Sequence, residues 1–470
     1  MNFKTLPSRR EFFRRGYSTI ATLGAAAAFG QAGLLTAQAQ TMGGYKALVC
    51  IFLFGGNDAN NMLIPNESVV TTDPQYSYKT YQNVRQNLAL PQNTLATIHD
   101  SASGKAFGLH PSLQPLADLY NRATPRATLV ANVGTLSQPV PRKGGKPDFT
   151  GITLPNNLYS HSDQQSEWQS LAVNGGANAG SGWAGRLADK LYSPGCNLSS
   201  TPQAFGNQLP TIGVNGNSLE LLGRCTQQTS ISMGNFGIIG PDATTKNDLT
   251  NMLSLSSGVT LVQAAESSLN SAIKVAGIVA SASNTPVTGF PNTDIGNQLA
   301  QVATLIKLNR DANLGAARQI YFCSQGGYDT HSDELNSQRT LLADLAQAMA
   351  AFDTYVSGPA LNMADTVVTF TQSEFSRTFQ PNGNGGTDHA WGEHAIVMGP
   401  VKGGQIYGTF PNLVLKGPDD SGDRGNWVPT TSVDEYGATM AKWFGLTTQA
   451  DLDYVFPNLI KFGYNGLKFL

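Results

Sequence analysis

The sequence is poor in charge and shows no excess of basic residues. Only 13% of its 470 residues are charged, and 30 Lys and Arg stand against 32 Asp and Glu, which gives a formal net charge of −2. No basic patch or stripe is present that could collect the phosphates of a nucleic acid, so no nucleic-acid partner is expected. Beyond the N-terminus, no stretch is long and apolar enough to cross a membrane.

Cysteine is scarce as well, with four in the chain. Cys50 and Cys323 lie in apolar, strand-like runs, which predicts buried free thiols. Cys196 and Cys225 lie in polar, loop-rich sequence, where they can pair in an oxidising compartment or stay reduced. The sequence leaves both possibilities open for this second pair.

Several familiar catalytic motifs are missing. The chain has no G-x-S-x-G elbow, so a serine triad of the α/β-hydrolase type is not expected. It also has no Walker A loop and no dinucleotide-binding fingerprint after a strand.

The N-terminus has the pattern of an export signal. Arg9 and Arg10 precede two phenylalanines in "SRREFFRRG", an alanine-rich apolar stretch follows, and Ala37-Gln38-Ala39 forms a small-x-small cleavage site. A membrane anchor is the alternative, but the apolar run is short and is broken by Gly, Gln and Thr. We therefore expect residues 1–39 to be a Tat signal that the Tat translocase recognises, and the remainder to be periplasmic or secreted.

The rest of the chain predicts an α/β fold with a mostly parallel central sheet. "ALVCIFLF", "QIYFCSQ" and "DTVVTFTQ" are apolar runs typical of parallel strands buried on both faces, and "AIVMG" and "RATLVANVG" are further candidates. Between the second and third runs, "ELNSQRTLLADLAQAMAAFDTYV" has apolar residues at helical spacing, which predicts helices on the sheet faces. Residues 40–470 are interpreted as one domain with a Ser/Asn/Gly-rich insertion or cap at about 174–299, which includes a helix candidate near 258–281.

Acidic and histidine residues follow the predicted strands at their carboxyl ends. Asp58 follows the first run, Asp329 and His331 follow the second, and Glu374 follows the third. Ligands of such sheets bind beyond these strand ends. Because Asp oxygen and His nitrogen together suit Zn, Fe or Mn, the pattern predicts a divalent metal site, with zinc favoured.

Each of these motifs also has a structural interpretation. Asp58 can cap the next helix, and Asp329 or Thr330 can cap a helix beginning near His331. Glu374 can pair with Arg377. Ser160 in "YSHSDQQSEW" is typical of a helix cap too, although the same position suits a nucleophile whose product is anionic.

A loop near the C-terminus concentrates histidine in a chain that has only six. "NGNGGTDHAWGEH" places Asp388, His389, Glu393 and His394 close together after a glycine run. The loop is either incidentally polar or supplies metal ligands or acid/base groups. We expect the glycines to fold it over the strand ends, with His389 as a ligand, Asp388 and His394 as further candidates, and His394 alternatively packed beside the next strand.

The order of these motifs resembles the alkaline phosphatase superfamily of metal-dependent phospho- and sulfohydrolases. More closely, the mature chain resembles the exported bacterial family called domain of unknown function 1501 from about residue 46 to 410. The matching stretches are "FLFGGNDANNMLIP", "YSHSDQQSEWQ", "SGWAGRLADKL", "GGYDTHSDE", "SEFSRTF" and "NGNGGTDHAWGEHAIVMGPVKGGQIYG".

The resemblance implies an alkaline-phosphatase-like fold and a hydrolase of phosphate or sulfate esters, small or linked to a polymer. It implies one or two metal ions, with Ser160 as nucleophile and Arg377 or His161 steadying negative charge. The implied ligands are Asp58, Asp329, His331, Glu374 and His389.

The chain also departs from the superfamily pattern. The Asp-His pair expected after the third strand is replaced by Ser373-Glu374-Phe375, and His394 or His161 can substitute. The alternative function is therefore a non-catalytic periplasmic binding protein with a degenerate metal site and a protein partner at the cap.

Overall fold

The computed structural model describes residues 44–67, 73–176, 178–193, 195–196, 209–231, 287–311, 314–464 and 466–470. The predicted Tat signal and the helix candidate near 258–281 lie outside the described residues. So does much of the predicted insertion at 174–299.

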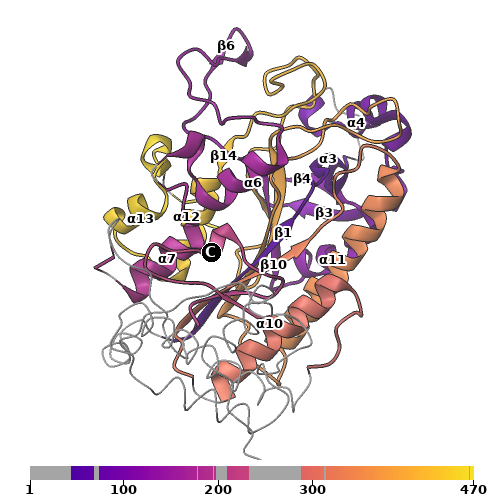
Figure 1. The fold of residues 1–470 in the computed structure, drawn as a ribbon. Helices are drawn as coiled ribbons and strands as arrows, with labels where there is room; N and C mark the ends of the chain where they lie inside the picture. The colour runs from indigo at the N-terminus through magenta and orange to yellow at the C-terminus, as the bar shows by residue number, and fades with distance from the viewer. Residues whose placement is uncertain are drawn as a thin grey trace, which may run out of the picture.

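A nine-stranded, mostly parallel sheet forms the centre of the molecule (Figure 1). Its strands, in spatial order, are β13 (Ile406–Gly408), β5 (Ala127–Gly134), β12 (Glu393–Met398), β11 (Val367–Gln372), β1 (Lys46–Leu53), β10 (Arg318–Gln325), β8 (Thr211–Gly213) and β9 (Thr229–Ser230), with β14 (Thr431–Ser432) paired to β5.

The three predicted runs are the three central strands, β11, β1 and β10. Both neighbours of β1 run parallel to it, with Leu48 opposite Ile320 on one side and Val368 on the other. Successive β1 residues alternate between the two faces, so that Val49 and Cys50 join different hydrophobic clusters. The prediction of a parallel sheet with buried central strands is confirmed.

The expectation that the "AIVMG" run is another parallel strand is wrong. The strand begins earlier, at Glu393, and β12 pairs antiparallel with both β11 and β5. No helix is assigned between β11 and β12. A parallel return requires a crossover, usually a helix, whereas a loop lets the chain re-enter the sheet in the opposite direction.

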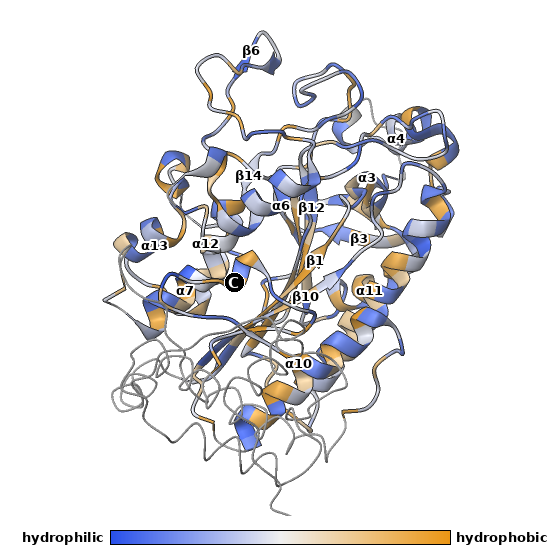
Figure 2. Ribbon diagram, viewed as in Figure 1, coloured by the Kyte–Doolittle hydropathy of each residue, from blue (hydrophilic) through white to orange (hydrophobic). Residues whose placement is uncertain are grey.

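Helices cover both faces of the sheet. On one side lie α5 (Gln114–Tyr120), α10 (Asp294–Asp311) and α11 (Glu334–Ser357), and on the other lie α6 (His161–Ser170), α7 (Trp183–Tyr192), α12 (Val433–Phe444) and α13 (Gln449–Val455) (Figure 1). The strands are largely apolar, and the helices carry polar residues on their outer sides (Figure 2). The predicted helix after β10 is α11, with Leu342, Leu345, Met349 and Phe352 buried against the sheet.

Smaller elements surround the sheet. They are α3 (Ala59–Met62), α4 (Tyr78–Arg85), a sheet of β2 (Leu63–Pro65), β4 (Lys105–Leu109) and β3 (Ala96–Asp100), and a hairpin of β6 (Arg142–Lys143) and β7 (Lys146–Pro147). Short 3-10 turns are η1 (Pro74–Tyr76), η2 (Gln86–Leu88), η3 (Gln92–Thr94), η4 (Pro111–Leu113), η5 (Val173–Gly175), η7 (Leu219–Leu221) and η8 (Leu459–Phe462).

The cysteines divide as the sequence suggested. Cys50 and Cys323 are buried free thiols in β1 and β10, as predicted. Cys196 and Cys225, for which the sequence left two possibilities, form a disulfide.

No helix within the described ranges has both the length and the apolar character that a membrane span requires.

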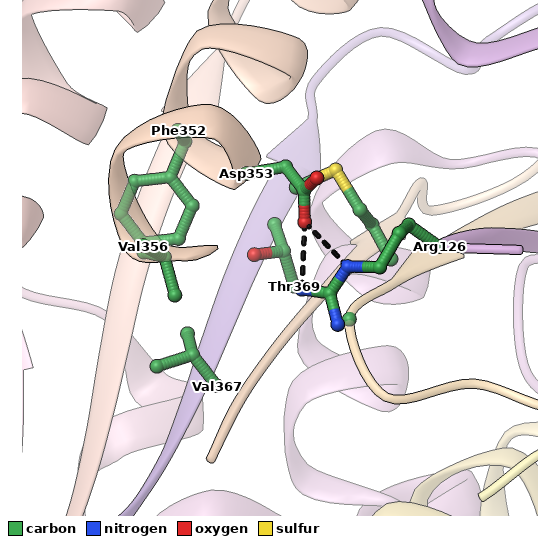
Figure 3. Close-up of a pocket in the computed structure, with 8 residues that line it drawn as sticks. Arg126, Phe352, Asp353, Val356, Val367 and Thr369 are labelled. Atoms are coloured by element: carbon green, nitrogen blue, oxygen red, sulfur yellow. Dashed lines mark hydrogen bonds and ion pairs between the residues drawn. The ribbon is translucent and has the colours of Figure 1, made fainter. Parts of the chain in front are cut away.

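A buried ion pair closes the edge of the sheet where the strands begin. Arg126, just before β5, donates through Nε and Nη2 to Oδ1 of Asp353 at 3.0 and 2.7 Å. Figure 3 shows the pair in a pocket that is also lined by Phe352, Val356, Val367 and Thr369. Because ligands of parallel sheets bind at the opposite edge, this pair is interpreted as structural.

Replacing Arg126 with Ala is expected to lower the free energy of unfolding by about 3 kcal/mol, because it leaves the buried Asp353 carboxylate without its main partner. Arg122 is the matched control, since its half-exposed guanidinium lies 3.7 Å from the same carboxylate. Arg122→Ala should cost less than about 1 kcal/mol. Urea unfolding of the three proteins measures the difference, and equal losses would contradict the assignment.

Candidate metal centre

The Asp329 carboxylate lies at the centre of a cluster beyond the end of β10. Its Oδ1 is 2.7 Å from Nη1 of Arg377 and 3.1 Å from Nε2 of both His331 and His389. Its Oδ2 is 3.5 Å from Nε2 of His161. Partial burial alone would raise the pKa of Asp329, but the hydrogen bond from Arg377 and its positive charge act against burial, and that pKa is lowered to about 2. The carboxylate is therefore ionised at any physiological pH.

Each of the three histidines has its other ring nitrogen fixed by an acceptor. Nδ1 of His161 lies 2.8 Å from Glu374 Oε1, that of His389 lies 2.7 Å from the Tyr159 carbonyl, and that of His331 lies 3.2 Å from Asp388 Oδ1. An acceptor at Nδ1 holds the proton there and leaves a lone pair on Nε2 of the neutral ring. Metal-binding histidines are oriented by partners of this kind.

The Nε2 atoms and the Asp329 oxygens then face one another as acceptors. Nε2 of His331 and Nε2 of His389 are 3.1 Å apart. Burial lowers the pKa of His389, which favours its neutral form, and the Tyr159 carbonyl at Nδ1 then leaves the Nε2 lone pair facing the Asp329 carboxylate. The Nε2 atom of His161 is buried and has no hydrogen-bond partner. The hydrogen bond to Glu374 raises the pKa of this ring, so a metal ion that binds Nε2 must displace a proton. This arrangement of lone pairs suits a cation.

Three of these residues meet the distance requirement of a shared metal ligand set. One ligand atom from each of His161, Asp329 and His389 lies within 4.8 Å of the others. Two imidazoles and one carboxylate are a donor set for zinc or non-haem iron, and three protein ligands leave positions for water or substrate.

Glu374, predicted to bind metal, lies behind His161. It is buried, and its Oε1 accepts from the Gly55 N–H, from Gln165 Nε2 and from His161. Phe375 packs against the rings of His161 and His389, with centroids 4.9 and 4.6 Å away. Both residues orient ligands, and the predicted alternative of a Glu374–Arg377 pair does not form.

Arg377, predicted to steady negative charge on a substrate, is fully buried. Its Nε and Nη2 donate to Thr387, and its Nη1 donates to the Gly55 carbonyl and to Asp329. All three nitrogens are thus engaged within the protein. The structure places Arg377 as the anchor of Asp329, away from solvent.

Asp58, predicted as a ligand, is not brought to the cluster. It caps α3 by accepting from the Asn60 N–H, so the alternative interpretation as a cap is confirmed. Its Oδ2 pairs with the buried guanidinium of Arg85, which also binds Glu334 at 3.0 Å. Glu334 in turn accepts from Thr387. The positively charged group beside Asp58 is therefore the Arg85 guanidinium, at the place where the sequence predicted a metal ion.

The loop that contains Asp388 and His389 brings only part of its polar set to the cluster. Asp388 Oδ1 holds Nδ1 of His331, and its Oδ2 pairs with Arg424, so it orients a histidine and is not itself among the three clustered ligands. His331 is half exposed and lies at the mouth of the cluster.

His394, the other candidate ligand in this stretch, is packed in the sheet. It is the second residue of β12, it is buried, and its ring lies 5.3 Å from that of Phe410. Its Nδ1 accepts from the Asn132 N–H at 3.0 Å. The interpretation as a packed residue is confirmed, and of the two predicted substitutes for the missing histidine only His161 reaches the cluster.

Two glycines allow the strand ends and the loop to meet. Gly55 has a φ of +120°, and a Cβ there would lie 2.3 Å from the Asp329 nitrogen. A Cβ at Gly386 would lie 2.3 Å from the His331 carbonyl carbon. Any side chain at either position would force the backbones apart.

Ser160 occupies the N-cap position of α6, directly before His161. Its side chain makes no capping hydrogen bond, and its Oγ lies 3.3 Å from Ser162 Oγ. Asp329 caps no helix either, because α11 begins later, at Glu334. Ser160 is therefore at the predicted cap position without a capping side-chain bond, and the predicted cap role of Asp329 is wrong.

Sequence reasoning missed several partners of the site. Gln165 lies four residues after His161 on α6, so helical spacing could have found it. Arg85 lies 27 residues from its partner Asp58, and Arg424 lies 36 residues from its partner Asp388. No local sequence signal links either pair.

His394 predicts a pH dependence of stability. Burial lowers its pKa to about 4, below the ordinary value of 6.5, so the unfolded chain binds more protons between these values. Stability should therefore fall as pH falls through this window, and His394 should account for about 2 kcal/mol between pH 7 and pH 5.

Urea unfolding at both pH values tests this with His394→Gln, which should lose that part of the pH dependence. The control is His99→Gln, since His99 is exposed in β3. An unchanged dependence in His394→Gln would contradict the assignment.

Solved structures similar to this chain share little of its sequence. The lipoteichoic acid synthase LtaP from Listeria monocytogenes has a TM-score of 0.33 at 9% identity, covering 86% of this chain and 73% of its own. Ps i-CgsB has 0.32 at 9%, covering 89% and 76%, and a 2-O GAG sulfatase has 0.29 at 8%, covering 87% and 72%. Similarity at this level carries no argument about activity.

No curated protein matches the chain. The family model described as "Protein of unknown function (DUF1501)" matches residues 45–421, which include every strand of the sheet except β14 and every residue of the cluster. The chain therefore belongs to the DUF1501 family.

Proposed function

We propose that this protein is an exported, metal-dependent hydrolase of phosphate or sulfate esters. The observation that carries the proposal is the convergence of ligand atoms from His161, His389 and Asp329. Ser160, whose hydroxyl makes no capping hydrogen bond, directly precedes His161. A cation-binding set next to a candidate nucleophile is what ester hydrolysis at an anionic centre requires.

In this proposal His161, Asp329 and His389 hold a single divalent ion, with zinc favoured and iron or manganese as alternatives. His331 is close enough to Asp329 and His389 to join them. When bound, such an ion supplies positive charge that lowers the pKa of a hydroxyl or water and screens ester oxygens. Arg377, Glu374 and Asp388 orient the ligands. One ion is proposed because Asp58 pairs with Arg85.

Ser160 is proposed as the nucleophile that forms a bond to phosphorus or sulfur. Because it makes no capping hydrogen bond, rotation about its side chain can aim the hydroxyl toward substrate. The first N–H groups of α6 have no intrahelical acceptors, and a helix N-terminus favours an anionic ester beside it.

The cellular location in this proposal comes from residues 1–39. The twin arginine, the weakly apolar stretch and the Ala37-Gln38-Ala39 site support export by the Tat translocase to the periplasm or beyond. The alternative function, a non-catalytic exported binding protein that keeps the metal, uses the same ligands. Turnover distinguishes the two.

Metal content is the first prediction from this site. The mature protein should retain about one equivalent of a transition metal after dialysis, and His161→Ala or His389→Ala should bind it at least about tenfold more weakly. Elemental analysis and zinc titration followed by thermal shift measure this. His99→Ala should behave as the wild type. Folded wild-type protein that binds no added metal would refute the proposal.

Substitution of Ser160 tests catalysis separately from metal binding. Ser160→Ala should keep the metal but lose at least about a thousandfold in turnover of aryl phosphate or aryl sulfate. Ser166→Ala is the matched control, since this serine is exposed on the same helix and its hydroxyl donates to the Ser162 carbonyl, so its loss should change turnover little. Equal turnover in Ser160→Ala would remove Ser160 from the mechanism. Metal binding without turnover in the wild type would favour the binding protein.

A further inference from the structure

A basic hairpin projects from the molecule at the edge of the sheet where β5 ends. The hairpin formed by β6 and β7, residues 142–147, extends beyond the neighbouring elements in the view of Figure 1. Its sequence is Arg-Lys-Gly-Gly-Lys-Pro, and Arg142, Lys143 and Lys146 are all exposed. Positive φ values at Gly144 and Gly145 make the tight turn at its tip.

The two lysines of this hairpin repel each other. Lys143 is paired with Lys146 directly across the two strands. Like charges in this position destabilise a hairpin. Neither lysine forms an ion pair with any residue that the structure describes, whereas Arg142 binds Asp419 at 2.7 Å. Two positive charges are thus held together at the tip without a counter-charge from the protein.

The base of the hairpin is fixed to the loop that carries His389. The Asp148 N–H donates to the Pro141 carbonyl at 2.9 Å and closes the base. Phe149 stacks on Trp391, two residues after His389, with ring centroids 6.5 Å apart. Leu158 packs on the same small cluster, next to the Tyr159 carbonyl that holds His389. The charged tip is therefore anchored to the metal-binding loop through packed side chains.

The chemistry of the tip favours an anionic, water-exposed partner. Between Arg142 and Pro147 it carries no aromatic or aliphatic side chain that could insert into a lipid surface, as interfacial membrane binding requires. Two adjacent ammonium groups can bind two neighbouring anionic groups in water. In a chain with a net charge of −2, this local charge is not a property of the whole surface.

We infer that the hairpin is a docking arm for a linear anionic polymer that carries several phosphate or sulfate esters. The inference rests on the proposed function and specifies its substrate: one ester lies at the metal-binding cluster while others along the same chain bind Lys143 and Lys146. A small monoester carries no further anionic group for the lysines, so the arm should act only on polymeric substrates.

Binding of fluorescent dextran sulfate to the mature protein, measured by anisotropy at roughly 50 and 300 mM salt, tests the arm. The Lys143→Gln/Lys146→Gln variant should bind about tenfold more weakly than the wild type at the lower salt, and the difference should shrink at the higher. Removing mutual repulsion should not destabilise the hairpin, and thermal unfolding checks this.

The matched control is Lys402→Gln/Lys442→Gln, which makes the same charge change at two exposed lysines near the other edge of the sheet. It should bind dextran sulfate within about twofold of the wild type. Uncharged dextran of the same length should bind none of the proteins, and aryl-ester turnover should be equal in all of them.

The outcomes separate the arm from the proposed activity. Weaker binding in the hairpin variant alone supports the arm, even when no protein hydrolyses an ester, in which case only the proposed function falls. Equal binding by all three proteins, or none by the wild type, overturns the arm. So does hairpin-dependent binding to phosphatidylglycerol vesicles without binding to the polymer, which would assign the tip to a membrane.

Discussion

The contact on which the site depends is the one between the buried guanidinium of Arg377 and the carboxylate of Asp329. Arg377 follows β11 and Asp329 follows β10, so the contact joins the ends of two strands that are separated by β1. It keeps Asp329 ionised and fixed in position, although nearly half of that side chain is exposed. Three imidazole rings are arranged around the oxygens held in this way.

The fold produces this contact because β1, β10 and β11 are parallel and adjacent, so their carboxyl ends lie at one edge. The antiparallel β12 contributes differently. Since it enters the sheet from the same edge, the loop before it must cross the strand ends, and this places His389 over Asp329. Gly386 allows the loop to lie directly against the backbone at His331.

The sequence predicted the parallel core because long apolar runs are a local property that burial on both faces imposes. It predicted the place of the site for the same reason, since strand ends can be read from where those runs stop. It could not choose between ligand and cap for Asp58, or find the positioning roles of Glu374 and Arg377, because the partners that decide these roles are not sequence neighbours. Arg85 is 27 residues from Asp58, Asp329 is 48 from Arg377 and His161 is 213 from Glu374. Asp58 and Asp329 each meet a buried arginine, but Asp58 is itself buried, whereas Asp329 is nearly half exposed and also meets three histidines. No local pattern records this difference. The direction of β12 could not be predicted from the sequence either, because an apolar run has the same pattern in a parallel and in an antiparallel strand.

Arg85 pairs with both Asp58 and Glu334 in the buried half of the strand-end edge. A guanidinium that belongs to the chain cannot dissociate, and it stays charged at any pH at which the protein is folded. The Asp58 carboxylate beside β1 is therefore paired with a fixed positive charge as soon as the chain folds, whatever ions are in solution. The half of this edge around Asp58 therefore needs no ion from solution. The half around Asp329, whose side chain is nearly half exposed, is the half at which ions can be exchanged with the solution.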